Sequence, residues 1–220
     1  MNEIPQPPPS GQPPVPLGEP YPLTFDVLYP DRDLNRVSTG LRIFAVIPIA
    51  IVLSFVSGSY VSSGGVTFGA GAGALFLAVL VMILFRQKYP RWWFDWNREL
   101  LRFSNRVGAY LFLLDDRYPS TDEQQSVRLE LRYPDVPTDL NRWLPLVKWL
   151  LAIPHYVVLF FLYVGVVLAV IGAWFAILFT GRYPRGIFDF VVGVMRWGNR
   201  VNAYAFLLIT DLYPPFRLSA

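Results

Sequence analysis

The sequence predicts an α-helical integral membrane protein with a small cytoplasmic β-sheet, built from two tandem repeats that together carry four transmembrane helices. Three observations lead to this fold class. Two long stretches, residues 43–85 and 149–181, contain no charged side chain. The same short motifs flank both stretches in the same order. Hydrophobic residues make up 54% of the chain and charged residues only 16%, against about 25% in soluble domains.

The flanking motifs predict a duplication, which is best recognised before single elements are assigned. Each repeat is expected to run strand, transmembrane hairpin, interfacial amphipathic helix, strand. The repeats span residues 21–120 and 126–218. The matched motifs are Tyr-Pro-Asp (29–31 and 133–135), Leu-Asn-Arg (34–36 and 140–142), Tyr-Pro-Arg (89–91 and 183–185) and Asn-Arg-Val (105–107 and 199–201).

Residues 1–20 are expected to form a disordered, proline-rich cytoplasmic tail. They contain eight prolines and few large apolar side chains, too few to offset the entropy of ordering the chain. Polyproline-like conformation is expected in part of the segment. Two interpretations stay open, a solvated tail and a docking peptide.

A transmembrane helix needs about 20 residues to cross a hydrocarbon core of about 30 Å. The first repeat divides at its Ser/Gly-rich middle into spans at about 39–59 and 68–86. The second repeat reaches two spans, at about 143–163 and 165–181, if Lys148 snorkels and Gly165 marks a tight turn. A shallow re-entrant hairpin that never crosses is the alternative.

Basic residues predict the orientation. They flank both predicted hairpins, whereas neither hairpin tip contains Lys or Arg. The positive-inside rule therefore places both termini in the cytoplasm and the protein in the inner membrane as a multi-pass protein. The uncharged stretches 43–85 and 149–181, which make up most of these spans, are unlike an autonomous ion or proton pathway.

Interfacial helices are predicted at about 91–107 and 185–201. Each begins Tyr-Pro-Arg, and proline is well tolerated in the first helical turn. Polar residues recur at spacings of three and four among Trp and Phe, which is typical of a helix lying at a headgroup layer. The stripe either faces water or contacts lipid phosphates or a partner's carboxylates. Its candidate contact residues are Arg91, Asp95, Arg98, Arg102, Arg106, Arg185, Asp189, Arg196 and Arg200.

Four segments read as strands. Residues 127–133 alternate between apolar and charged side chains, and residues 21–28 do so less cleanly. Residues 109–114 and 203–209 are short apolar runs that end before Asp and Tyr-Pro. We expect these four strands to pair into one small sheet that ties the repeats together.

Two runs carry a family resemblance: residues 173–190, beginning AWFAILFTGRYP, and residues 200–216, which end in Tyr-Pro-Pro-Phe. They resemble an uncharacterised actinobacterial membrane family, domain of unknown function 4389, over about 127–218. The first half resembles a diverged copy. The resemblance implies inner-membrane residence and no particular activity. The chain also resembles accessory subunits of mycobacterial MCE-type lipid-import transporters, which implies a membrane-complex partner.

No catalytic constellation is expected. The chain has no cysteine, so a thiolate metal site is not possible, and its one histidine, His155, cannot by itself make a metal cluster. No cofactor motif or nucleic-acid recognition motif is present in the sequence. We therefore expect a non-enzymatic accessory or scaffold subunit that contacts membrane lipids and a membrane-protein partner. The alternative is an autonomous lipid-binding or lipid-handling protein.

Overall fold

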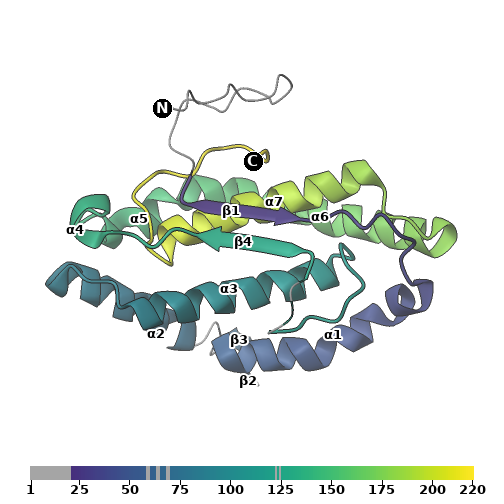
Figure 1. Ribbon diagram of the computed structural model, residues 1–220, viewed down its shortest axis with the longest axis horizontal. Helices are drawn as coiled ribbons and strands as arrows, with labels where there is room; N and C mark the ends of the chain where they lie inside the picture. The colour runs from purple at the N-terminus through teal and green to yellow at the C-terminus, as the bar shows by residue number, and fades with distance from the viewer. Residues whose placement is uncertain (1–20, 58–59, 63–64, 68–69, 122, 124) are drawn as a thin grey trace, which may run out of the picture.

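A two-stranded sheet lies at the centre of the computed structural model, which describes residues 21–57, 60–62, 65–67, 70–121, 123 and 125–220. The strands are β1 (Leu23–Val27) and β4 (Val127–Leu131). Figure 1 shows them side by side, with α7 (Arg185–Ala205) next to β1 and α3 (Arg91–Leu111) next to β4. The predicted tail, residues 1–20, lies outside the described residues.

The two strands pair antiparallel, with Phe25 opposite Leu129 at the middle of the register. Alternate side chains point to opposite faces of a strand. Accordingly Leu23, Phe25 and Leu129 are buried, whereas Asp26 is exposed. The strands predicted around 21–28 and 127–133 are therefore confirmed, and the sheet has one packed face and one open face.

The expected four-stranded sheet is wrong. Residues 109–111 and 203–205 are the last turns of α3 and α7 instead of strand residues. These helices continue four residues past the predicted ends because Ala109 and Ala203, like their neighbours, still pack inward. The chain then reverses at Leu113 and Leu208, which both adopt positive φ. The remaining apolar residues form buried turns.

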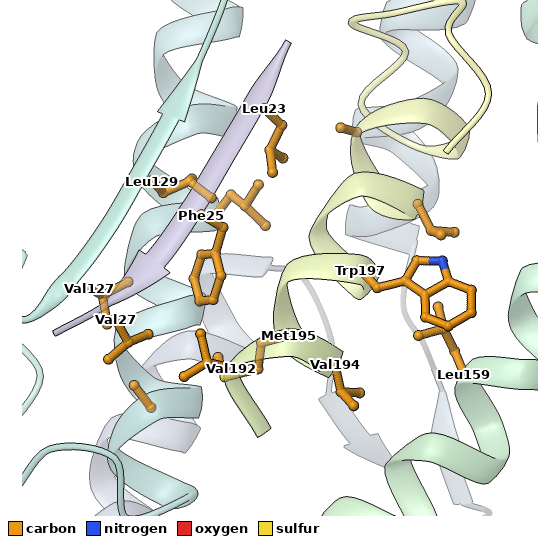
Figure 2. Packing of buried hydrophobic residues seen from close by; sticks show 14 of the residues in the cluster. Leu23, Phe25, Val27, Val127, Leu129, Leu159, Val192, Val194, Met195 and Trp197 are labelled. Carbon is orange, nitrogen blue, oxygen red and sulfur yellow. The ribbon is translucent and has the colours of Figure 1, made fainter. Parts of the chain in front are cut away.

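Helix α7 is the central element and not a surface helix. Figure 2 shows Val192 and Met195 pointing toward the sheet, while Trp197 points toward Leu159 on the neighbouring helix. Thirteen α7 residues are buried. Helices α3 and α7 both begin directly after a proline, as predicted. They form a middle layer with the sheet on one side and the apolar helices on the other.

The apolar layer contains the segments predicted to span the membrane. Two helices are long and apolar enough to cross it, Arg36–Ser54 and Ile153–Thr180. Only 17% of each window is buried, so their apolar surface is mostly open. The layer comprises α1 (Arg36–Ser57), α2 (Ala70–Val81), the π-helix η1 (Met82–Arg86), α5 (Pro145–Leu151) and α6 (Ile153–Thr180).

Three short elements complete the described chain: β2 (Tyr60–Ser62), β3 (Gly65–Thr67) and α4 (Val136–Asp139). The first-repeat helices match their predicted bounds closely, but not their predicted arrangement. In Figure 1 α1 and α2 occupy opposite ends of one edge of the molecule, whereas a hairpin requires them side by side. Helix α1 packs against α3 and α6 instead.

The second predicted hairpin is also wrong. Helix α6 runs unbroken through Gly165, where a tight turn was expected. Gly165 is accommodated in the helix because the ring of Phe190 on α7 packs close to it. The real break lies at Ala152, between α5 and α6, just before Pro154. Proline lacks the N–H needed inside a helix but fits a first turn.

Lys148 does not snorkel to the membrane surface, because its side chain is fully buried. Its Nζ donates to the backbone oxygen of Thr210 over 2.7 Å and lies 2.6 Å from an Asp211 carboxylate oxygen. Arg42, at the matching place in the first repeat, donates to the backbone oxygens of Tyr110 and Asp115. Both cations hold the turns that follow the middle-layer helices.

Candidate functional site: an arginine-lined hollow

The outer members of the predicted polar stripe remain on the surface of α3 and α7. Asp95 and Arg98 form an ion pair of 3.2 Å within α3, and Arg185 and Asp189 form one of 3.7 Å within α7. The Arg91 guanidinium lies over the ring of Tyr133. Exposed ion pairs of this kind contribute little to stability, at most about 1 kcal/mol each. These five predicted residues therefore behave mainly as a solvated surface.

Arg102 and Arg196 turn inward and hold the sheet. Arg102 Nε donates to the backbone oxygen of Leu129 over 3.0 Å, and Arg196 Nε donates to that of Phe25 over 2.8 Å. Each helix thus binds the strand that belongs to the other predicted repeat. Arg196 also pairs with the Asp26 carboxylate at 3.0 Å.

Arg106 and Arg200 bind chain segments that border the sheet. Arg106 donates to the backbone oxygen of Ser120 over 2.6 Å. Arg200 donates to the backbone oxygens of Arg217 and Ser219, over 3.2 and 2.8 Å. Backbone carbonyls accept hydrogen bonds without balancing a positive charge. Both contacts therefore position a guanidinium while leaving its charge uncompensated.

These four arginines converge on one hollow of about 1340 Å³ that follows the strands and opens to solvent. Its lining includes eight arginines and only three acidic side chains. Helices α1, α5 and α6 contribute no lining residue among those described. The arginines are Arg32, Arg102, Arg106, Arg117, Arg128, Arg196, Arg200 and Arg217, and the acids are Asp26, Asp115 and Glu130.

The electrostatics of the hollow favour an anion. Burial lowers the pKa of the Arg200 guanidinium, and the nearby cations Arg217 and Arg196 lower it further. The Arg200 Nε is buried without a hydrogen-bond partner. An incoming carboxylate or phosphate would relieve the repulsion between these cations, and arginine suits both groups because its donors form a planar fork.

Half of the lining arginines lie outside the predicted polar stripe: Arg32, Arg117, Arg128 and Arg217. They lie in loops, on the open face of β4 and in the C-terminal segment, so no helical periodicity connects them with α3 or α7. The alternation around Arg128 placed it on the open face of a strand, and that signal could have found it. The other three are brought in only by the tertiary fold.

At the rim of the hollow, Arg32 forms a bidentate contact with the Asp116 carboxylate. Burial alone would raise the pKa of that carboxyl. The hydrogen bonds from Arg32 and from the backbone N–H of Asn35 outweigh burial, and the pKa of Asp116 lies below its usual value. This cluster joins the start of α1 to the loop after α3.

Two asparagines connect α3 and α7 below the sheet. Asn105 Nδ2 donates to Asn199 Oδ1 over 2.9 Å, and Asn199 Nδ2 donates to Asn105 Oδ1 over 2.7 Å. Both side chains are buried. The reciprocal amide pair lies at matching positions of the two Asn-Arg-Val motifs and fixes the contact between the middle-layer helices.

His155 is a packed side chain in this structure. Its Nδ1 accepts a hydrogen bond of 3.0 Å from Trp197 Nε1, and its ring stacks on Phe216. Within the described part of the chain, no three His, Cys, Asp or Glu side chains are placed to hold a metal ion. The chemistry that the described residues do support is binding of an anionic group in the hollow.

Residues 143–217 match the model of a protein family described as "Domain of unknown function (DUF4389)". The match lies within the segment 127–218 for which this resemblance was expected, and it confirms the resemblance over those residues. Neither the curated proteins nor the solved structures contain a match to the chain.

Proposed function

We propose that the protein is a non-catalytic accessory subunit of a membrane complex, anchored by its apolar helices and binding an acidic segment of a partner through the hollow. The observation that carries this proposal is the convergence of arginines from both repeats on one open site. Hollow and apolar layer lie on opposite sides of the α3–α7 layer. The protein therefore presents a cationic face to water and an apolar face to lipid.

Membrane association is supported by the open surface of α1 and α6. The exposed large side chains of α6 are all apolar or aromatic, with Phe161 at 68% and Leu168 at 66% exposure. A contiguous apolar surface of this kind marks a membrane or protein interaction site. The inner membrane is the location expected from the resemblance.

The position of the hollow favours a protein partner over a lipid headgroup. Headgroups lie within a few ångströms of the hydrocarbon that the apolar layer would contact. The hollow is separated from that layer by the α3–α7 layer, and helices with their side chains are about 10–12 Å thick. An acidic peptide segment can approach from the aqueous side, where rim residues such as Arg117 and Arg128 are exposed. Autonomous lipid binding is the alternative function.

We also propose that the chain arose by internal duplication, with the two repeats related by a pseudo-twofold axis through the sheet. Exchanged contacts between matching residues support this origin. Tyr29 donates its hydroxyl hydrogen bond to the backbone oxygen of Tyr183, and Tyr133 donates to that of Tyr89. The reciprocal asparagine pair and the exchanged strand contacts of Arg102 and Arg196 follow the same relation.

The resemblance to accessory subunits of MCE-type lipid-import transporters supplies the partner class to be tested. In that setting the protein would hold an acidic cytoplasmic segment of a transporter subunit. Its own chain would supply position and electrostatic attraction, and the transporter would move the lipid.

Affinity purification of the tagged full-length protein from its native membrane, in mild detergent, tests the proposal. The variant Arg117→Glu/Arg128→Glu reverses two exposed lining charges that hold no helix or strand in place by a described contact. The matched control is Arg132→Glu, which reverses an exposed arginine beside β4 but outside the hollow lining. Mass spectrometry then quantifies the recovered partner subunits.

We expect stoichiometric recovery of transporter subunits with the natural protein and the control, and a loss of at least tenfold with the double variant. Equal recovery with all three proteins would contradict partner binding through the hollow. Recovery of the natural protein with lipid alone would favour the alternative function.

A further inference from the structure

Helix α6 is longer than the hydrocarbon core of a bilayer. Its 28 residues extend about 42 Å at 1.5 Å per residue, against a hydrocarbon core of about 30 Å. A bilayer with its headgroup regions is about 40–45 Å thick, so length alone does not decide between a crossing helix and a lying one. The length is unremarkable for a helix that lies along the membrane.

Helix α7 runs antiparallel to α6, so it places charged residues beside α6 at the depth that a crossing α6 would occupy in the membrane. Phe190 packs against Gly165, and Trp197 donates to His155, so residues 190–197 lie beside the first half of α6. Asp189 directly precedes Phe190, so its ion pair with Arg185 lies beside the middle of α6, and the two side chains are 63% and 65% exposed. If α6 crossed the membrane, this exposed ion pair would lie within hydrocarbon, where charged side chains are costly.

The sheet gives a second, independent reason. Strands β1 and β4 form a two-stranded sheet within the described residues, and their outer edges are not closed into a barrel. Open sheet edges do not occur in contact with the hydrocarbon of a bilayer, because their backbone groups would lose hydrogen bonds. The sheet is attached along α7 and α3, so it would enter the bilayer together with any crossing helix.

We propose that α1 and α6 lie in the plane of a single leaflet, so that the protein enters the membrane from one side and does not cross it. This inference rests on the proposed membrane anchoring and replaces the four predicted spans with a monotopic arrangement. The hydrocarbon of one leaflet is about 15 Å deep, half of a core of about 30 Å. One layer of helices, about 10–12 Å thick, fits this depth.

The buried and the exposed side chains of α6 lie on opposite sides of the helix, as expected for a helix in the plane of the membrane. Its buried residues form one narrow stripe that faces α7 and α1, and the opposite side is apolar along its full length. The stripe consists of His155, Leu159, Val166, Ala173 and Ile177. Helix α1 repeats the arrangement, with exposed Phe44, Ile47 and Ile51 opposite buried Val46. Acyl chains of one leaflet are the occupant that covers such a face while the sheet stays in water.

Spin-label depth measurement tests the inference in the full-length protein. The chain contains no cysteine, so each variant carries one label. Suitable positions are Val157→Cys, Phe161→Cys, Leu168→Cys and Phe175→Cys, all exposed on one side of α6 and spread over about 27 Å of helix. Thr24→Cys on the open face of β1 is the aqueous control. The relative accessibility to oxygen and to a water-soluble nickel quencher reports depth in vesicles.

We expect the four labels to share one depth within a few ångströms, with the control in water. A depth that is greatest near Leu168 and falls toward both ends would show a crossing helix and overturn the inference. Labels shielded from both quenchers would show that a protein covers the face, which also overturns it. Failure of the natural protein to fractionate with membranes would instead refute the proposed anchoring.

A membrane-impermeant thiol reagent gives a second reading in spheroplasts. For a protein held in the cytoplasmic leaflet, the aqueous Thr24→Cys thiol is expected to react only after the cells are opened, and thiols on the lipid-facing side of α6 are not expected to react. The variant Gly165→Cys is decisive, because a transmembrane hairpin would place this residue at its outer tip. Reaction of that thiol in intact spheroplasts would contradict the single-leaflet arrangement.

Discussion

Removal of one member of the buried asparagine pair is expected to destabilise the protein more than removal of both. Asn105 and Asn199 exchange two hydrogen bonds of 2.9 and 2.7 Å and are only 7% and 6% exposed. The variant Asn199→Leu removes both bonds and leaves the carbonyl of Asn105 buried without its donor. The double variant Asn105→Leu/Asn199→Leu replaces the pair by two apolar side chains of similar size.

The magnitude follows from the number of bonds. A net hydrogen bond contributes about 0.5–1.5 kcal/mol, and an unsatisfied buried group costs about 1–3 kcal/mol. We therefore expect Asn199→Leu to lower the free energy of unfolding by about 2–3 kcal/mol. For a chain of this size that corresponds to a fall of roughly 4–12 °C in melting temperature. The double variant should recover at least about 1 kcal/mol of this loss.

Thermal unfolding of the four proteins of this mutant cycle, in one mild detergent, measures the coupling. The matched control is Asn202→Leu on the same helix, at a half-buried position where no side-chain hydrogen bond is described. It should change the melting temperature by less than about 3 °C, since substitutions away from such features cost about 0.5 kcal/mol or less. Additive losses at positions 105 and 199 would refute the reciprocal pair.

Three further outcomes are expected. Because the folded-state pKa of Asp116 is lowered, its contact with Arg32 stabilises the protein above the ordinary carboxyl pKa. That contribution is lost as the pH falls through the lowered pKa. The melting temperature of Asp116→Asn should therefore fall less between pH 6 and pH 3 than that of the natural protein. Lys148→Met leaves the half-buried Asp211 without its cation and should lower the melting temperature by several degrees, whereas an unchanged value would refute a stabilising role of this ion pair. Gly193→Ala places a methyl group 2.9 Å from the C-terminal segment and should increase proteolysis of that segment, which limited digestion with mass spectrometry would detect.

The sequence predicted elements well where one physical pattern dominates. The alternation in β4, the prolines before α3 and α7 and the bounds of α1 all agree with the structure. The predicted break at Gly165 failed because glycine inside an apolar helix is tolerated when a neighbour packs against it. Pro154 was the stronger signal, since proline constrains the backbone wherever it occurs.

The arrangement of the apolar helices could not be read from hydropathy. A stretch long enough for two short spans is also long enough for one helix lying along a membrane. The choice depends on what packs beside it, and α7, which carries its charged residues on another face, packs against α6 only in three dimensions. For a related reason, only half of the arginines that line the hollow could be predicted. Helical spacing connects Arg102 with Arg106 and Arg196 with Arg200, but no local pattern connects either pair with a loop arginine such as Arg117.

The central claim is that the apolar helices contact lipid while the cationic hollow faces water. Its most direct test is photolabelling of native membranes with an apolar carbene reagent, followed by mapping of the modified residues. The account predicts that modification is confined to the open side of α1, α5 and α6, with Phe161 and Phe175 among the modified residues and the β1–β4 sheet unmodified. A pattern in which only a narrow band of α6 is modified, or in which the sheet is modified as strongly as α6, would contradict it.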